Sequence, residues 1–242
     1  MASLIDSCEL FVARSIERSK EPRVYLCWVD DHQRTRSYVL SKKPQPSRYW
    51  LVSMESMNNL NLRPKVSVGL QRSIYVMEDA KDIDTKMLKV LDCASHQWSE
   101  TEPMTHGRNS EAFLLTVGEN LCVLGGIQDE SRKLKPEMYN PKTRQWVSLP
   151  EPDLDENSSV VLMNSTDNGD IELWAVSEGK ATRFIYNTMA ASAVWEKRTS
   201  WLGRAQPKVH TVVIGNSIFR IIMSQIICYD KNTMVWRSVR GV

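Results

Sequence analysis

The chain has 242 residues, a formal net charge of +2, 42% hydrophobic residues and 25% charged residues. This is the composition of an ordinary globular protein with enough apolar material for a sizeable core. The nearly neutral charge gives no support for a nucleic acid or an anionic membrane as a partner. No stretch approaches the roughly 18 apolar residues that span a bilayer, and the first residues lack the layout of a signal peptide.

The first predicted elements are four short strands at about residues 8–16, 23–29, 35–40 and 48–54, where apolar runs alternate with polar turns. The segment 8–16 would be an inner strand, although its pattern also suits a short helix. In the next stretch, a run at 74–77 leads to a second run at 90–92 and to Trp98. The third stretch has a run at 113–117, a turn, a run at 121–124 that ends at Gly125 and Gly126, then Tyr139 and Trp146.

The last two stretches repeat this order. A run at 171–176 leads to Tyr186 and Trp195, and strands predicted at 207–214, 217–222, 225–229 and 234–239 include Tyr229 and Trp236. From Trp50 onward these tryptophans are spaced by 48, 48, 49 and 41 residues, and the apolar runs recur at intervals of 50, 47, 50 and 47. Two independent markers with one period indicate an internal repeat of about 48 residues.

Four strands per repeat at this period are typical of the blades of a β-propeller, in which neighbouring sheets cover each other's apolar faces. The sequence therefore predicts an all-β, single-domain propeller over residues 1–242. About five four-stranded blades are expected, at about 8–54, 65–100, 110–149, 158–198 and 207–239, and an incomplete six-bladed ring stays open as an alternative. The residues interpreted as structural parts of the repeat are Gly125, Gly126, Tyr139, Tyr186, Tyr229, Trp50, Trp98, Trp146, Trp195 and Trp236.

The cysteines and histidines predict neither a metal site nor another cofactor. The five cysteines are widely separated, form no CxxC pair and mostly have apolar neighbours, which is typical of reduced thiols that pack as small hydrophobic side chains. Reduced thiols indicate a reducing compartment, the cytoplasm or the nucleus. The four histidines show no local metal-binding spacing.

The third repeat closely resembles a kelch repeat. Its residues 121–126, 139–146 and 149–150 follow the kelch pattern, and Arg108 stands where an arginine often opens a blade in that family. The similarity covers essentially the whole chain, although the other repeats lack the double glycine. Residues 91–98 look most like the propeller part of plant F-box/kelch proteins, a family in which an amino-terminal F-box recruits a ubiquitin ligase and the propeller holds the substrate. Only about twenty residues precede the apolar run at 23–29, too few for an F-box, so none is expected here.

The resemblance implies a protein-interaction module rather than an enzyme, and in its sharpest form the substrate-recognition propeller of a ubiquitin-ligase assembly. One face of a kelch propeller is built from loops within the blades and connections between them, here about 30–36, 79–86, 102–108, 127–134, 151–157 and 202–206. A monomer is expected to bind an acidic or phosphorylated protein or peptide through cations on these segments. The expected contact residues are Arg34, Arg36, Arg108, Arg132, Lys133 and Arg204.

Two alternatives to this function stay open. The pattern Glu78-x-x-x-Asp82-x-x-x-Lys86 is similar to the iron-binding ExxxDxxxH motif of specifier proteins, small-molecule enzymes that resemble kelch propellers. A lysine replaces the histidine, and a protonated lysine cannot bind iron. The other alternative is a degenerate kelch paralogue with little retained activity, which the loss of glycines from most repeats permits.

Overall fold

The computed structural model describes residues 24–29, 35–42, 49–54, 64–78, 85–109, 111–127, 134–155, 157–166, 168–177, 180–190, 194–200, 211–214, 217–222, 225–230 and 235–239. All regular structure in these ranges is β-strand, and no helix in them is long and apolar enough to cross a membrane. The chain divides into two compact units, residues 1–131 with 137–148, and residues 132–136 with 149–242.

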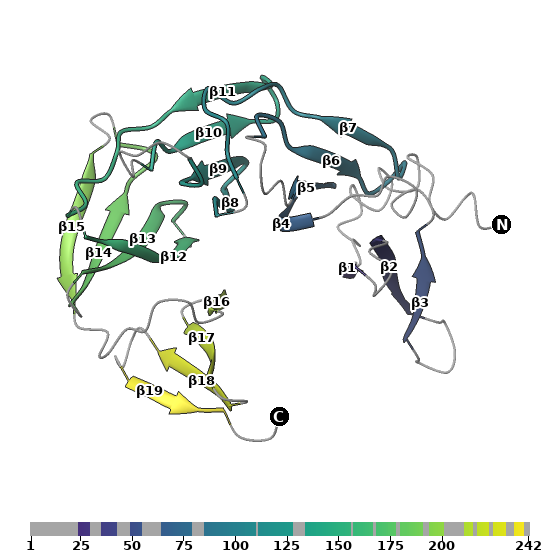
Figure 1. Ribbon diagram of the computed structural model, residues 1–242. Coiled ribbons are helices and arrows are strands. Elements are labelled where there is room, and N and C mark those ends of the chain that lie inside the picture. The colour runs from purple at the N-terminus through teal and green to yellow at the C-terminus, as the bar shows by residue number, and fades with distance from the viewer. Residues whose placement is uncertain are drawn as a thin grey trace. The chain divides into compact units, whose positions relative to one another are not determined.

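The first unit contains three antiparallel sheets, in which consecutive strands lie side by side in chain order (Figure 1). The first sheet has three described strands, β1 (Val24–Val29), β2 (Thr35–Lys42) and β3 (Tyr49–Ser53). The second contains β4 (Pro64–Leu70), β5 (Ser73–Glu78), β6 (Lys89–Asp92) and β7 (Trp98–Glu100). The third contains β8 (Phe113–Val117), β9 (Asn120–Leu124), β10 (Glu137–Asn140) and β11 (Gln145–Ser148).

The second unit contains two four-stranded sheets of the same order. One is built from β12 (Ser159–Ser165), β13 (Ile171–Ser177), β14 (Lys180–Tyr186) and β15 (Trp195–Ser200). The other is built from β16 (Thr211–Ile214), β17 (Ser217–Ile222), β18 (Gln225–Asp230) and β19 (Val235–Ser238). These sheets overlap the predicted blades, and the predicted inner strand at 8–16 lies outside the described residues. A single propeller domain over the whole chain stays a prediction.

A recurring turn joins the third and fourth strands of a sheet. In the second sheet, the Asp92 Oδ1 atom accepts hydrogen bonds from the backbone N–H groups of Ala94 and Ser95. In the third sheet, Asn140 Oδ1 does the same for the next turn, and in the fourth Asn187 Oδ1 accepts from Met189. Short polar side chains that bind the backbone two residues ahead favour such turns.

The core of the first unit lies between the second and third sheets. The apolar side chains of β4 and β5 meet those of β8, β9 and β10, and in β9 every residue from Leu121 to Leu124 is buried. A strand that is apolar on both of its faces needs cover on both sides, which is why its sequence runs without polar alternation. A smaller cluster of Val39, Met54 and Leu91 joins the first sheet to the second.

Candidate functional site at the connection between β7 and β8

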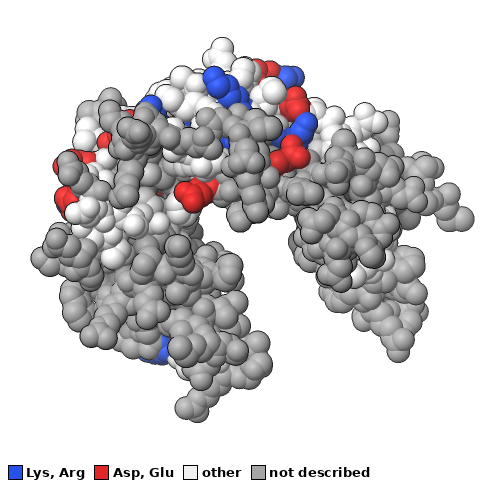
Figure 2. Space-filling view, in the orientation of Figure 1, with Lys and Arg blue, Asp and Glu red and all other residues white. Residues whose placement is uncertain are grey.

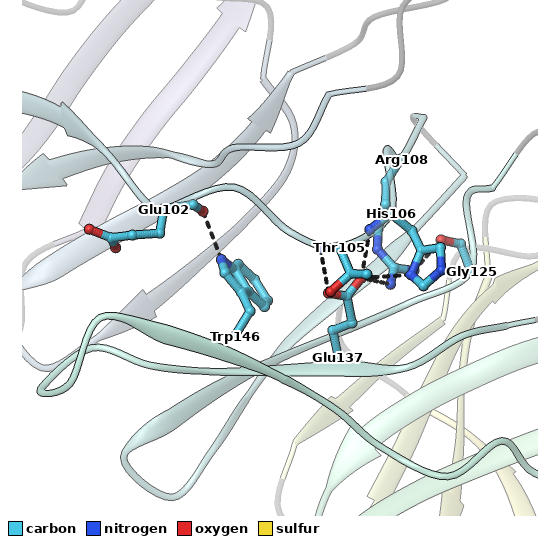
Figure 3. A network of polar contacts seen from close by, with 7 residues as sticks. All are labelled: Glu102, Thr105, His106, Arg108, Gly125, Glu137 and Trp146. Carbon is cyan, nitrogen blue, oxygen red and sulfur yellow. Dashed lines mark hydrogen bonds and ion pairs between the residues drawn. The ribbon is translucent and has the colours of Figure 1, made fainter.

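The connection at residues 101–109, which leads from β7 to β8, is held by side chains of the next sheet. The Trp146 indole Nε1 donates a hydrogen bond to the Glu102 carbonyl oxygen at 2.8 Å (Figure 3). The Tyr139 hydroxyl donates to Glu102 Oε2 at 2.9 Å, and Arg144 Nε donates to Glu102 Oε1 at 2.6 Å. Burial raises the pKa of Tyr139, and its bond to Glu102 raises it further, so the phenol keeps its proton and donates.

The Glu137 carboxylate, at the start of β10, binds the second half of this connection. Its Oε2 accepts from the Thr105 backbone N–H at 2.8 Å, and its Oε1 accepts from Arg108 Nη2 at 2.7 Å. The backbone N–H and the Nδ1 atom of His106 both lie 3.3 Å from Oε1. Figure 3 shows these groups gathered around one carboxylate. We call residues 101–109, held in this way, the clamped connection.

Arg108 and Glu137 form a buried ion pair, with 0% and 1% of their side chains exposed. Burial acts to raise the pKa of Glu137, but hydrogen bonds from Arg108 and Thr105 and the charge of Arg108 outweigh it, so the pKa lies below its usual value. Burial lowers the pKa of Arg108, while Glu137 acts to raise it. Because a guanidinium is effectively always protonated in proteins, Arg108 stays charged and the pair is ionic.

The double glycine that follows β9 also binds the clamped connection. Arg108 Nη1 donates to the Gly125 carbonyl at 2.8 Å, and the Asn109 backbone N–H donates to the Gly126 carbonyl at 2.6 Å. Gly125 and Gly126 have φ angles of 76° and 68°. A Cβ atom on Gly126 would lie 2.6 Å from the Ala112 backbone nitrogen. Glycine is therefore required at Gly126 both by its backbone conformation and by the close approach of Ala112.

The clamped connection runs antiparallel to the segment 85–88, so the ends of two loops predicted to bind a partner lie side by side. Thr85 and Arg108 exchange two backbone hydrogen bonds of 2.9 Å, and the Met104 N–H donates to the Lys86 carbonyl at 2.7 Å. Met104 itself is buried. We call the outward residues of the two segments the paired-loop surface; they are the exposed Lys86, Met87, Pro103 and Thr105 and the half-buried His106.

The described charges near the outer strands of the first unit are arranged in ion pairs. Figure 2 shows Lys and Arg side chains alternating with Asp and Glu side chains over the part of this unit that carries β7 and β11. The pairs are Arg72 with Asp92, Lys89 with Glu100, Lys142 with Glu119 and Arg144 with Glu102. Exposed ion pairs of this kind contribute little to stability. Because the two charges of each pair cancel, these pairs attract a charged partner only weakly.

The structure rules out Arg108 as a contact residue and places Arg36 in a strand. Arg108 is fully buried and bound to Glu137, so it cannot contact a docked protein. Arg36 lies within β2, opposite Trp28 of β1, rather than in a loop. The other four, Arg34, Arg132, Lys133 and Arg204, lie outside the described residues.

The aromatic residues of the repeat are placed as follows. The Tyr139 and Trp146 rings lie 4.9 Å apart, and those of Tyr186 and Trp195 lie 5.2 Å apart. Trp195 Nε1 donates to the Pro150 carbonyl at 2.7 Å, as Trp146 does to Glu102. Trp98 is half-buried. The side chains of Trp50, Tyr229 and Trp236 lie outside the described residues.

Sequence reasoning missed Glu137, although a signal for it was present. Glu137 stands two residues before Tyr139 in the same strand, and side chains two apart in a strand share a face. Since Tyr139 was interpreted as a buried aromatic residue, Glu137 had to point inward as well. A buried carboxylate needs a cationic partner, and Arg108 was available.

The part of the chain that the structure describes holds no cluster of three or more His, Cys, Asp or Glu residues that could bind a metal ion. Glu78, at the end of β5, and Lys86, on the paired-loop surface, are described, whereas Asp82 lies outside the described residues. The iron-binding alternative therefore gains no support from the geometry.

No protein-family model matches the chain. It is similar to the F-box/kelch-repeat proteins At4g19865 and At4g39550 of Arabidopsis thaliana, with 28% and 24% identity. Both alignments cover 99% of this chain, and they cover 62% and 65% of the relatives. A third relative from the same plant, F-box/kelch-repeat protein At4g39560, is 28% identical over 62% of this chain and 57% of its own length. The chain thus spans less than two thirds of the length of these relatives.

The solved structure of YjhT has the same fold, with a TM-score of 0.51 and 15% identity over 75% of this chain and 66% of YjhT. With the relatives, it confirms the resemblance to F-box/kelch-repeat proteins and the all-β, kelch-type propeller class that the repeat predicted.

Proposed function

We propose that this chain is a protein-interaction module that holds a protein or peptide against a rigid surface, and not an enzyme. The observation that carries the proposal is the clamped connection. One buried carboxylate accepts hydrogen bonds from the backbone of Thr105 and from the Arg108 side chain, which fixes the segment that carries Pro103, Thr105 and His106 of the paired-loop surface. A surface that is ordered before binding loses less conformational entropy when a partner docks.

The composition of the paired-loop surface supports a protein partner. Met87 and Pro103 offer apolar contact, Thr105 and His106 offer polar contact, and Lys86 offers a positive charge. Thioether side chains adapt to partner surfaces of varied shape. Two of the named relatives add support, because they are F-box/kelch-repeat proteins that align with nearly all of this chain.

The finer proposal is a substrate-recognition propeller of a ubiquitin-ligase assembly in the cytoplasm or the nucleus. The partner segment is acidic or phosphorylated. Lys86 on the paired-loop surface supplies positive charge that attracts it, Arg108 does not, and Arg34, Arg132, Lys133 and Arg204 stay predicted contacts. Four other cations of the first unit do not contribute, because Arg72, Lys89, Lys142 and Arg144 already bind carboxylates.

The test is affinity capture of proteins from a cell lysate on the folded chain, followed by mass spectrometry. The test variant combines Lys86→Glu, Arg132→Glu and Arg204→Glu, and the control is Lys142→Glu, an exposed change of the same kind at a pair remote in sequence from the paired loops. We expect the variant to lose at least tenfold of the captured partner, about 1.4 kcal/mol of binding free energy, and the control to retain it.

Two results would overturn the proposal. Equal capture by the test variant and the wild-type chain would show that the partner binds elsewhere. An empty capture together with stoichiometric bound iron, and turnover that Glu78→Gln abolishes, would instead establish the enzyme alternative.

A further inference from the structure

The turn between β12 and β13 carries an asparagine followed by a glycine, Asn168 and Gly169. No other asparagine in the sequence precedes a glycine. Asn168 is exposed, and Gly169 has a φ of 79° with no atom within 4 Å of the position that a Cβ would occupy. On that side, neither a side chain of its own nor a neighbouring atom shields the backbone nitrogen of Gly169.

An exposed asparagine in this position can lose ammonia through a reaction within the chain. The Gly169 backbone nitrogen gives its proton to water or hydroxide and attacks the Asn168 Cγ atom, which closes a five-membered succinimide ring and releases the side-chain nitrogen as ammonia. Water then opens the ring at one of its two carbonyl carbons. Opening at Cγ gives aspartate, and opening at the main-chain carbon gives isoaspartate, in which the chain continues through Cβ.

Hydrogen bonds restrain the Gly169 peptide in the folded chain. Its N–H donates to the Thr166 carbonyl at 2.9 Å, and its carbonyl accepts from the Thr188 hydroxyl at 2.9 Å. The Asp170 N–H donates to Thr166 Oγ1 at 3.1 Å. Because the attacking nitrogen must first leave the Thr166 carbonyl, the rate of the reaction depends on how often the turn opens. Such openings are local and cost less free energy than global unfolding.

We propose that Asn168 is a site of spontaneous deamidation, and that the hydrogen bonds of the Gly169 peptide to Thr166 and Thr188 set its rate. The reactants are this chain and water, so no further reagent is required. The site lies in the second compact unit and shares no residue with the paired-loop surface. Its absence would leave the protein-interaction function untouched.

Deamidation changes both the charge and the length of the turn. The product has one more carboxylate, two residues before Asp170 in the sequence. Isoaspartate also adds one atom to the main chain between Ser165 and Ile171, the cross-strand pair of β12 and β13 that adjoins the turn. The modified chain is therefore more acidic and separates from the original chain by ion exchange.

The test is incubation of the folded chain at neutral pH, followed over time by peptide mapping with mass spectrometry. We expect the peptide that contains Asn168 to gain the mass difference between an amide and a carboxylic acid, and to divide into aspartate and isoaspartate forms. The peptide that contains Asn140 is expected to stay unchanged, because Pro141 has no N–H group and its nitrogen cannot attack. Asn168→Gln, which keeps the amide but would need a larger ring, is expected to abolish the change.

The role of the hydrogen bonds has its own test, the Thr188→Val variant. Loss of one hydrogen bond of ordinary net strength lets the turn open about fivefold more often, so deamidation should be about fivefold faster. Thr182→Val, the matched change within β14, is expected to leave the rate unchanged, and the urea-unfolded chain is expected to react fastest.

Three results would overturn the proposal. One is a folded chain in which the Asn168 peptide gains no mass while the urea-unfolded chain reacts. The second is an equal gain at Asn140, which would mean that the succinimide route is not the cause. The third is a Thr188→Val chain that reacts no faster than the wild type.

Discussion

At the residue scale, the buried pair of Arg108 and Glu137 determines how the connection between β7 and β8 is held. Removing one partner of a buried pair leaves a desolvated charge without compensation, whereas removing an exposed pair changes little. The chain offers both cases, because Glu137 is buried against Arg108 and Glu119 pairs with Lys142 on the surface.

We expect Glu137→Gln to lower the free energy of unfolding at pH 7 by about 3–5 kcal/mol, because the Arg108 guanidinium stays buried without a counter-charge. The control Glu119→Gln is expected to change it by less than about 0.5 kcal/mol. Urea unfolding followed by tryptophan fluorescence measures both.

The pH dependence of the same variant has a definite sign. Burial acts to raise the pKa of Glu137, but the Arg108 and Thr105 hydrogen bonds and the Arg108 charge lower it overall in the folded chain. A lowered carboxyl pKa contributes stability above the unfolded value, about 4.3, and this contribution is lost as the pH falls toward the folded value. The difference between the wild type and Glu137→Gln should therefore shrink below about pH 4. A difference that grows in acid would contradict this explanation.

At the element scale, the turn after β9 shows why the third repeat keeps its double glycine. Gly126 combines a positive φ with a close approach to Ala112, while Gly118, in the turn between β8 and β9, has a φ of 58° and no atom within 4 Å of an added Cβ. Substituting alanine at Gly118 and at Gly126 therefore separates the energetic cost of the backbone conformation from the cost of a steric clash.

We expect Gly118→Ala to lower the free energy of unfolding by about 1 kcal/mol, through the positive φ alone. Gly126→Ala is expected to lower it by clearly more, because the new methyl group would meet backbone atoms of Ala112 that cannot move without breaking the clamp. The pair is compared by urea unfolding. Equal losses in the two variants would show that Ala112 moves aside freely.

At the scale of the whole molecule, the described residues form five sheets that follow one another along the chain, three in the first compact unit and two in the second. Blades of a propeller depend on their neighbours for cover, so one domain unfolds as one system. Separate units with their own cores unfold independently.

We expect a single propeller domain to unfold in one transition, with coincident urea curves from tryptophan fluorescence and from far-ultraviolet circular dichroism. Glu137→Gln lies in the first unit and is expected to move the entire curve to lower urea. Two resolved transitions, of which Glu137→Gln shifts only one, would show instead that the two units are independent domains.

Much of the fold could be predicted from the chain because local signals agreed. The turns at Asp92 and Asn140 follow from short polar side chains, and the buried run at Leu121 to Leu124 follows from a strand without polar residues. The candidate site was predicted less well. The connection at 102–108 was expected to contact a partner, but Arg108 was assigned to the surface because its carboxylate partner is 29 residues away in sequence.

The amino-acid sequence by itself determined the repeat, the all-β class and the resemblance to kelch-repeat proteins, because these depend on strand periodicity and on turn residues close together in the chain. Only the tertiary structure decided that Arg108 points inward, that Glu102 and Glu137 hold the connection, and that Leu51 and Val52 on β3 are exposed. Side-chain burial and ion pairing depend on which distant segments meet, and a pattern read along one strand does not contain that information.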